Sequence, residues 1–275
     1  MFIQRPTAQL HTLSFGQGPL TLLAVGGWTA GGEIWHTLFG ELANWRCISV
    51  DHRGTGASMH SGPITVEDMA DDLLAVADAL QVGPCVLAAE SSGATAVLRA
   101  VQRAPQRFIG QVLVGAAWKR IEPRASDAFI AALRHDYTAT LRAFIDNSLP
   151  ETDSIALRRW GMQMLTRSSV DDAVDMLRCR ELIAPPDQLP RLTLPTLLIH
   201  GERDRIVPPQ DARELAERLG SAQLHILPEL GHVPIITAPA EVAALIAGFG
   251  DRILTEHLRK PRFLHPPPQP LRRSS

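Results

Sequence analysis

The sequence predicts an α/β fold, in which a mostly parallel β-sheet carries helices on both faces. Short, nearly continuous apolar runs alternate along the chain with segments of helical spacing. Runs of this kind are typical of strands that are buried on both faces of a parallel sheet. A chain of 275 residues, 45% hydrophobic and 20% charged, also has the size and composition of one large globular domain.

Six apolar runs are the predicted strands. In chain order they are Leu20–Val25, Cys47–Val50, Cys85–Ala89, Gln111–Val114, Thr196–Ile199 and Gln223–Leu227. Between them, apolar residues at three- and four-residue spacing predict helices over Val66–Leu80, Ala94–Arg103, Asp211–Leu219 and Ala240–Leu258. Thr65, with Asp68 three residues later, is a helix N-cap signature, whereas Gly248 and Gly250 are expected to interrupt the last helix.

The alternation of strands and helices stops between about Trp118 and Asp187. This stretch has helical spacing and no convincing strand, so we predict an inserted helical cap over residues 118–187. The core then comprises residues 1–117 and 188–260. Residues 261–275 are rich in Pro and Arg, which predicts a disordered tail.

Charge and composition exclude several classes of function. With 27 basic and 29 acidic residues, the net charge of −2 argues against a nucleic-acid partner. No apolar run approaches the roughly 18 residues that span a bilayer, and the first residues do not read as a signal peptide. Three separated cysteines suit buried thiols in a reducing compartment. We therefore expect a cytoplasmic protein without a membrane partner.

The junction after the third predicted strand carries two adjacent serines, Ser91 and Ser92. A tight strand-to-helix turn can hold a nucleophile exposed, but it needs small residues two positions before and after that nucleophile. Ala89 and Gly93 meet this requirement for Ser91, whereas Glu90 would crowd a turn centred on Ser92. Ser91 is the predicted nucleophile, although a plain helix N-cap would also explain these serines.

A serine nucleophile needs a general base and an orienting acid. Asp204 follows the fifth predicted strand by a few residues, and His232 follows the sixth. The order Ser91, Asp204, His232 is the order in which one particular fold carries its catalytic triad. Glu122, which follows the fourth predicted strand, is the alternative acid, but Asp204 fits better.

From about Leu10 to Leu258 the chain resembles the α/β-hydrolase superfamily. Besides the serine junction, residues 51–58 (DHRGTGAS) match the family's D-x-R-G-x-G-x-S loop. Residues 201–204 (GERD) match its acid-bearing turn, and Gly231-His232 its histidine loop. The resemblance implies Ser91 as nucleophile, Asp204 as orienting acid and His232 as general base.

The resemblance also implies an oxyanion hole formed by two backbone amides, those of Ser92 and Trp28. The family usually has a His where this chain has Gly26, and we expect the loop to be packed more loosely as a result. The predicted pocket wall is apolar, which favours an uncharged, hydrophobic acyl or alcohol group. Internal helix packing is an equal explanation for its cap residues. The predicted wall consists of Trp28, Trp118, Phe129, Phe144, Trp160, Met164 and Val233.

Other polar residues in these motifs are expected to have structural roles. His52, His200 and His225 are the histidines nearest to the motifs. Glu90 is expected to face the loop that bears Gly56, with contact to a polar substrate group as the alternative. No metal-binding spacing, dinucleotide fingerprint or phosphate loop occurs in the sequence, so neither a metal nor another cofactor is expected.

The predicted function is hydrolysis of a small apolar ester or lactone by a serine acyl-enzyme mechanism. Relatives of this kind suggest three rival activities: C–C bond hydrolysis, perhydrolysis and cofactor-free dioxygenation. Gly27-Trp28 resembles the dioxygenase oxyanion loop weakly. A dehalogenase would need a carboxylate in place of Ser91. A non-catalytic ligand receptor on the same scaffold is the alternative from another class. The substrate and the oligomeric state do not follow from the sequence.

Overall fold

The computed structural model describes residues 1–182 and 193–259. Within these residues, nine strands form one sheet in the order β1-β2-β4-β3-β6-β7-β8-β9, with β5 paired to β2. The pairs from β4 to β9 are parallel, and the pairs made by β2 are antiparallel. The predicted mostly parallel sheet is confirmed.

The strands are β1 (Phe2–Arg5), β2 (Ala8–Phe15), β3 (Leu20–Val25), β4 (Trp45–Val50), β5 (Met59–His60), β6 (Cys85–Glu90), β7 (Phe108–Val114), β8 (Thr196–Gly201) and β9 (Ala222–Leu227). The six predicted strands correspond to β3, β4 and β6 to β9. Every residue of β6 and β8 is buried, as expected for strands covered on both faces. The antiparallel strands β1, β2 and β5 were not predicted.

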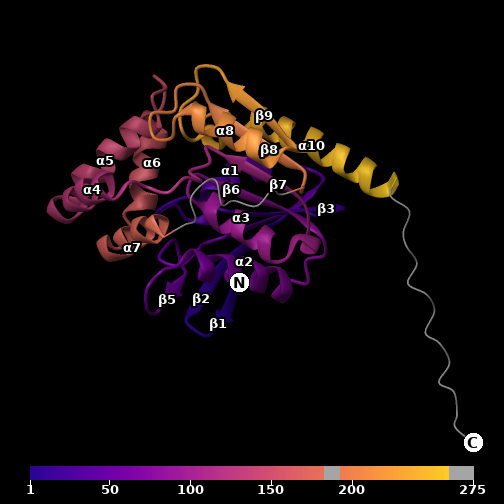
Figure 1. Cartoon of the computed structure of the whole chain (residues 1–275), viewed down its shortest axis with the longest axis horizontal. Helices are drawn as coiled ribbons and strands as arrows, with labels where there is room; N and C mark the ends of the chain where they lie inside the picture. The colour runs from indigo at the N-terminus through magenta and orange to yellow at the C-terminus, as the bar shows by residue number, and fades with distance from the viewer. Residues whose placement is uncertain (183–192, 260–275) are drawn as a thin grey trace, which may run out of the picture.

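Helices cover the sheet on both faces because the direction of the connections reverses after β4 (Figure 1). From β3, the chain moves through α1 (His36–Gly40) toward β4, on the β1 side. It then returns through α2 (Val66–Ala79) to β6 and continues through α3 (Gly93–Arg103) to β7. Right-handed crossovers in opposite directions place α1 and α2 on opposite faces. Accordingly α2 packs against α3, and α1 packs against the last helix, α10 (Pro239–Arg259).

The change in direction of the connections after β4 also indicates where a ligand would bind. Ligands of open α/β sheets bind at the carboxyl ends of the strands, where the direction of winding changes. Here that position lies between the ends of β3 and β6, which are neighbours in the sheet. The loop that begins at Gly26 follows β3, and Ser91 follows β6.

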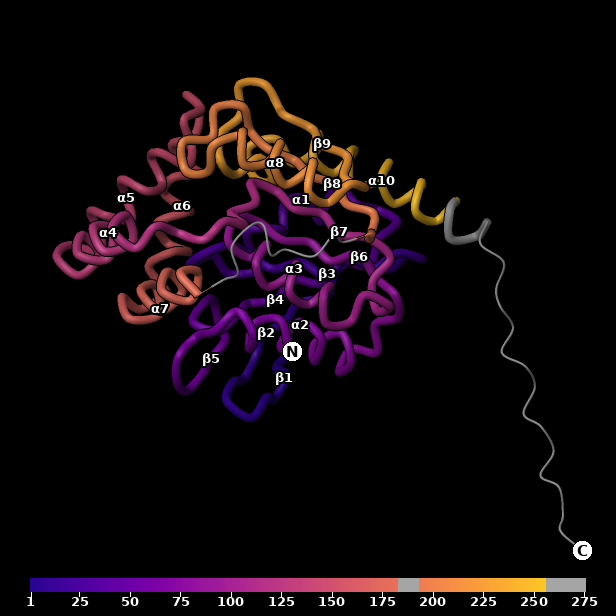
Figure 2. The backbone as a smooth tube through the Cα atoms, viewed as in Figure 1, coloured from indigo at the N-terminus to yellow at the C-terminus, as the bar shows by residue number. Residues whose placement is uncertain are grey.

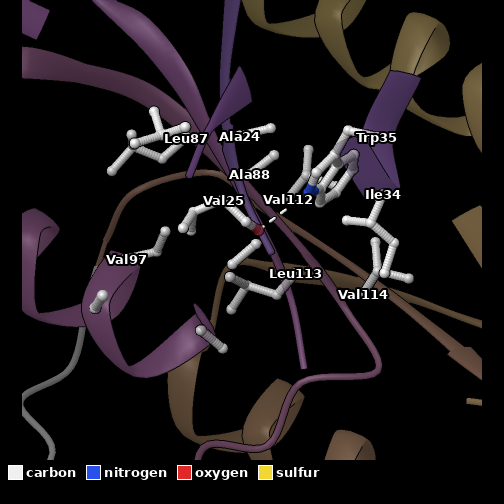
Figure 3. Close-up of a cluster of buried hydrophobic side chains, with 14 of the residues drawn as sticks. Ala24, Val25, Ile34, Trp35, Leu87, Ala88, Val97, Val112, Leu113 and Val114 are labelled. Atoms are coloured by element: carbon white, nitrogen blue, oxygen red, sulfur yellow. Dashed lines mark hydrogen bonds between the residues drawn. The ribbon is translucent and has the colours of Figure 1, made fainter. Parts of the chain in front are cut away.

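The core beneath this position is tightly filled. Figure 3 shows side chains of β3, β6 and β7 packed against Ile34 and Trp35 of the 3₁₀ helix η1 (Gly32–Trp35). Trp35 is fully buried, and its indole N–H donates to the Val25 carbonyl at 3.0 Å. This bond satisfies the one polar group of a large buried ring at the end of β3.

Four helices occupy the segment that was predicted as a cap. They are α4 (Pro123–His135), α5 (Tyr137–Ser148), α6 (Ile155–Leu165) and α7 (Val170–Glu181), and they lie together beyond one end of the sheet (Figure 2). The division into a core (1–117 and 188–260) and a cap (118–187) stays a prediction, because residues 183–192 lie outside the described chain, as does the predicted tail 261–275.

The remaining helices agree closely with those predicted from the sequence. Thr65 caps α2, accepting a hydrogen bond from the Asp68 amide as predicted. The predicted helix after β8 is α8 (Pro209–Leu219), and a short helix, α9 (Pro234–Thr237), precedes α10. The expected interruption of the last helix at Gly248 and Gly250 is wrong, since α10 is continuous. Gly250 is needed there because a Cβ would lie 2.2 Å from the Trp45 ring. None of the described helices is long and apolar enough to cross a membrane.

Candidate active site

The junction between β6 and α3 is a strained turn centred on Ser91. Ser91 has φ of +49°, a left-handed conformation that non-glycine residues rarely adopt, whereas Ser92 has φ of −69°. A Cβ at Gly93 would lie 2.4 Å from the Gly26 carbonyl oxygen. Ala89 is fully buried within β6. The small residues on each side are therefore required by the turn, and the strained residue is the predicted nucleophile.

The three side chains that were predicted as a triad lie in one chain of hydrogen bonds. Ser91 Oγ is 2.9 Å from His232 Nε2, and His232 Nδ1 is 2.7 Å from Asp204 Oδ2. All three residues are buried. Because Asp204 accepts the Nδ1 hydrogen, Nε2 of the neutral ring is free to accept the serine hydrogen.

The Asp204 carboxylate is held by more donors than the imidazole alone. Its Oδ1 accepts the backbone N–H groups of Ile206 and Val207, at 2.8 and 2.9 Å. Its Oδ2 also lies 3.1 Å from Nε2 of His200, a buried histidine at the end of β8. Burial would raise the pKa of Asp204, but the charge of His232 and these hydrogen bonds lower it well below the usual range. The environment of Asp204 therefore favours its ionised form.

The histidine loop is fixed by the connection between α5 and α6. The His232 N–H donates to the Ser148 carbonyl at 2.9 Å, and the Gly231 N–H donates to the Glu151 carboxylate at 2.7 Å. Burial lowers the pKa of His232, but the charges of Asp204 and Glu90 raise it above the ordinary value. His232 is therefore positioned by the helical segment, and its pKa is raised by two carboxylates.

The loop after β3 is buried along its length, from Gly26 to Gly32. The expectation that Gly26 loosens this loop is wrong, because a Cβ at Gly26 would lie 2.3 Å from the Ala30 carbonyl oxygen. The Trp28 indole N–H donates to the Ala173 carbonyl on α7 at 2.8 Å. Within the described chain, neither the Trp28 amide nor the Ser92 amide has a hydrogen-bond partner. Both predicted oxyanion donors are therefore available to a ligand.

Glu90 faces the reactive centre, so the expectation that it faces Gly56 is wrong. Its Oε1 lies 3.5 Å from Nε2 of His232. Its Oε2 fills the space beside Gly27, where an added Cβ would lie only 2.4 Å away. Burial raises the pKa of Glu90 to about 7, although His232 and the Gly27 backbone favour the ionised form. The side chain turns this way because Gly27 leaves room for it.

A small cavity opens above these groups. Its volume is about 50 Å³, and since about 10–15 Å³ of this kind of volume holds one water molecule, it accepts a chain of a few heavy atoms. Apart from Glu90, Ser91, His232, Thr29 and Ser148, the residues that line it are glycine or apolar. They are Trp28, Ala30, Ile34, Phe144, Ile145, Leu149, Leu157, Trp160, Gly161, Met164, Leu165, Val233 and Ile236.

Five of the seven predicted pocket residues line this cavity, and two do not. Phe129 packs behind Trp28, with ring centroids 5.3 Å apart. Trp118 is directed toward α8, where its indole N–H donates to the Asp211 carbonyl at 2.9 Å. The prediction that Trp118 lines the pocket is wrong, because a contact partner more than 90 residues away in the chain leaves no local signal.

The alternative acid and the other histidines lie elsewhere. Glu122 is exposed at the start of α4 and makes no hydrogen bond to His232. His52 was expected to be structural, and it binds the carbonyl of Gly27 in the loop after β3. Within residues 1–182 and 193–259, no group of three or more His, Cys, Asp or Glu side chains is arranged to hold a metal ion.

Comparison with known proteins agrees with this geometry. A sequence profile of the alpha/beta hydrolase fold matches residues 21–239. A pimeloyl-[acyl-carrier protein] methyl ester esterase of Vibrio vulnificus (strain YJ016) is 26% identical over 263 residues, covering 90% of this chain and 100% of the relative. A putative carbamate hydrolase RutD of Caulobacter sp. (strain K31) is 27% identical over 259 residues, covering 83% and 90%.

Among solved structures, the esterase EaEST from Exiguobacterium antarcticum superposes with a TM-score of 0.85 and 20% identity, over 91% of this chain and 98% of that one. Fold and sequence profile together place the protein in the class of α/β enzymes with a central, mostly parallel sheet. The chain belongs to the alpha/beta hydrolase fold family, and it is an enzyme of that family.

Proposed function

We propose that the protein is a serine hydrolase that cleaves small apolar carboxylic esters. One observation carries the proposal: the hydrogen-bonded series Ser91, His232 and Asp204 stands at the base of an apolar cavity. The relatives support ester cleavage, since the Vibrio vulnificus protein bears the name of a methyl ester esterase. Hydrolysis of a lactone by the same groups is the second form of this proposal.

In the proposed mechanism Ser91 Oγ attacks the ester carbonyl while His232 Nε2 takes the hydroxyl proton. The imidazolium that forms is stabilised by Asp204, which also holds the ring in the correct tautomer. The negative charge on the carbonyl oxygen is stabilised by the amides of Trp28 and Ser92, which have no other partner among the residues that the structure describes. His232 then donates its proton to the leaving alcohol, and water releases the acid from Ser91.

The cavity supports a restriction on the substrate. Its volume of about 50 Å³ fits an acyl or alcohol group of a few heavy atoms. Its lining of Phe144, Trp160 and Met164 favours an uncharged group, because a charge there would be desolvated without a partner. We therefore expect short-chain esters to be turned over faster than long-chain or charged ones.

Covalent labelling tests the assignment of the nucleophile. A fluorophosphonate should modify Ser91 and abolish hydrolysis of short aryl esters, with the modified residue located by peptide mass spectrometry. Ser91→Ala should leave only the residual catalysis of binding and oxyanion stabilisation, whereas Ser92→Ala retains its backbone amide and most of the activity. Circular dichroism controls for folding. An active Ser91→Ala variant, or labelling at another residue, refutes the proposal.

The rival activities give different products. A dioxygenase would consume oxygen, and a C–C bond hydrolase would act on a diketone-like substrate while leaving simple esters intact. A receptor on the same scaffold would bind an ester without turnover. Ester cleavage that depends on Ser91, without oxygen uptake, separates the proposed function from the dioxygenase, the C–C bond hydrolase and the receptor.

A further inference from the structure

The loop after β3 is held from outside the site by His52, a residue of the loop after β4. His52 is 4% exposed, and its Nε2 lies 2.8 Å from the carbonyl oxygen of Gly27. Its Nδ1 lies 3.0 Å from the Arg53 carbonyl oxygen. Burial lowers the pKa of His52, which favours the neutral ring with one hydrogen to donate. In the tautomer with its hydrogen on Nε2, the ring donates to the Gly27 carbonyl.

The hydrogen bond from His52 to the Gly27 carbonyl acts on the peptide group between Gly27 and Trp28. The Gly27 carbonyl and the Trp28 N–H belong to the same peptide group, and no described peptide bond is cis. In a trans peptide the C=O and N–H point in opposite directions. A donor that fixes the Gly27 carbonyl therefore also fixes the direction of the Trp28 N–H. Hydrogen bonding at the carbonyl further polarises the N–H of the same unit.

The neighbouring contacts leave this peptide unit dependent on His52. The Ala30 N–H also reaches the Gly27 carbonyl, but at the longer distance of 3.2 Å. The Trp28 side chain is fixed at its ring, through its bond to Ala173, and not at its backbone. Because Gly27 has no Cβ, the direction of its carbonyl is set by packing and hydrogen bonds rather than by steric limits of its own backbone.

We propose that His52 is a positioning residue for the oxyanion hole, acting through the Gly27–Trp28 peptide group. The proposal rests on the proposed function, in which the Trp28 amide stabilises the oxyanion. His52 touches neither substrate nor reacting atoms. It matters because the Trp28 N–H must be aimed before the charge develops, since reorientation during the reaction would cost part of the stabilisation.

Substitutions that keep or remove the donor test the role. Removal of an oxyanion donor costs about 10²–10³ in kcat, so a misdirected donor in His52→Leu should cost between about tenfold and hundredfold, with KM little changed. His52→Gln places an amide N–H near the position of Nε2 and should stay within about threefold of the parent. His52→Asn is too short to reach Gly27 and should behave like His52→Leu.

A second readout separates positioning from general structural support. A trifluoromethyl ketone forms a tetrahedral adduct with Ser91 whose oxyanion uses the same amides, so its Ki should weaken by the same factor as kcat. His36→Leu is the matched control, because His36 also bonds through Nε2, to Ser49 Oγ at 3.0 Å, away from the cavity. That variant should keep the parent kcat and Ki.

The outcomes are distinct. The proposal is overturned if His52→Leu and His52→Asn keep the parent kcat and Ki, or if folded His52→Gln is as impaired as they are. If His52→Leu does not fold, the comparison of His52→Asn with His52→Gln still tests the proposal. Failure of the proposed function would be seen separately, as a parent enzyme without Ser91-dependent ester cleavage.

Discussion

Replacement of Glu90 by Gln should move the acid limb of the pH profile to lower pH. The substitution keeps the shape of the side chain and removes its charge. Three charged groups act on His232: Asp204 and Glu90 raise its pKa, and Arg180 lowers it. Loss of one of the two carboxylates lowers the pKa of His232. The ring then stays neutral, and able to accept the serine proton, at more acidic pH.

The size of the shift follows from the 3.5 Å between Glu90 Oε1 and His232 Nε2. At an effective dielectric constant of about 20, two unit charges at this separation interact by about 5 kcal/mol. If Glu90 were fully ionised, this interaction would correspond to about 3.5 pKa units of His232. Because the pKa of Glu90 is itself raised to about 7, the carboxylate and the ring titrate as a coupled pair. The expected shift is accordingly about 1–3 units.

The assay is kcat/KM for a short aryl ester between pH 4.5 and 9, which reports the ionisations of the free enzyme. Glu67→Gln removes an exposed carboxylate that pairs with Arg99 and Arg103, and it should leave the profile unchanged. An acid limb that stays in place in Glu90→Gln, or that moves to higher pH, refutes the electrostatic role of Glu90.

Two further substitutions give large effects of different kinds. Asp204→Asn should lower kcat by about 10⁴, as the equivalent change does in serine proteases, while Glu122→Gln should change it little. The reverse order in steady-state kinetics would transfer the acid role to Glu122. Asp72→Ala leaves the buried guanidinium of Arg53 without its 2.6 Å partner, so urea unfolding should show a loss of about 3–5 kcal/mol. A loss under about 1 kcal/mol would mean that Arg53 finds another partner.

The sequence predicted the parallel part of the sheet because burial on both faces leaves continuous apolar runs. It did not reveal β2, whose buried positions include Thr12 and whose other residues are partly exposed. Strands β1 and β5 are shorter still. They are recognised by their pairing with β2 and not by their composition. Antiparallel edge strands of this kind have no strong local signal.

The proximity of Ser91, Asp204 and His232 could be predicted from motifs because each residue follows a strand of the sheet. The direction of the Glu90 side chain did not, since it depends on the absence of a side chain at Gly27, more than 60 residues earlier. The contact between His52 and Gly27 is likewise formed between loops that follow different strands. The D-x-R-G-x-G-x-S loop was the only available pointer to His52, and it gives no direction for that ring.

The cavity lining has a genetic consequence, because its helical half comes from one continuous piece of chain, α5 and α6. Recombination at two points around residues 137–165 would exchange that half in a single event and leave Ser91 and Asp204 untouched. The exchanged piece is not independent of the chemistry, however. Ser148 and Glu151 within it hold the loop that bears His232. A chimera that inherits a new lining but loses these two contacts would acquire a new pocket and displace His232.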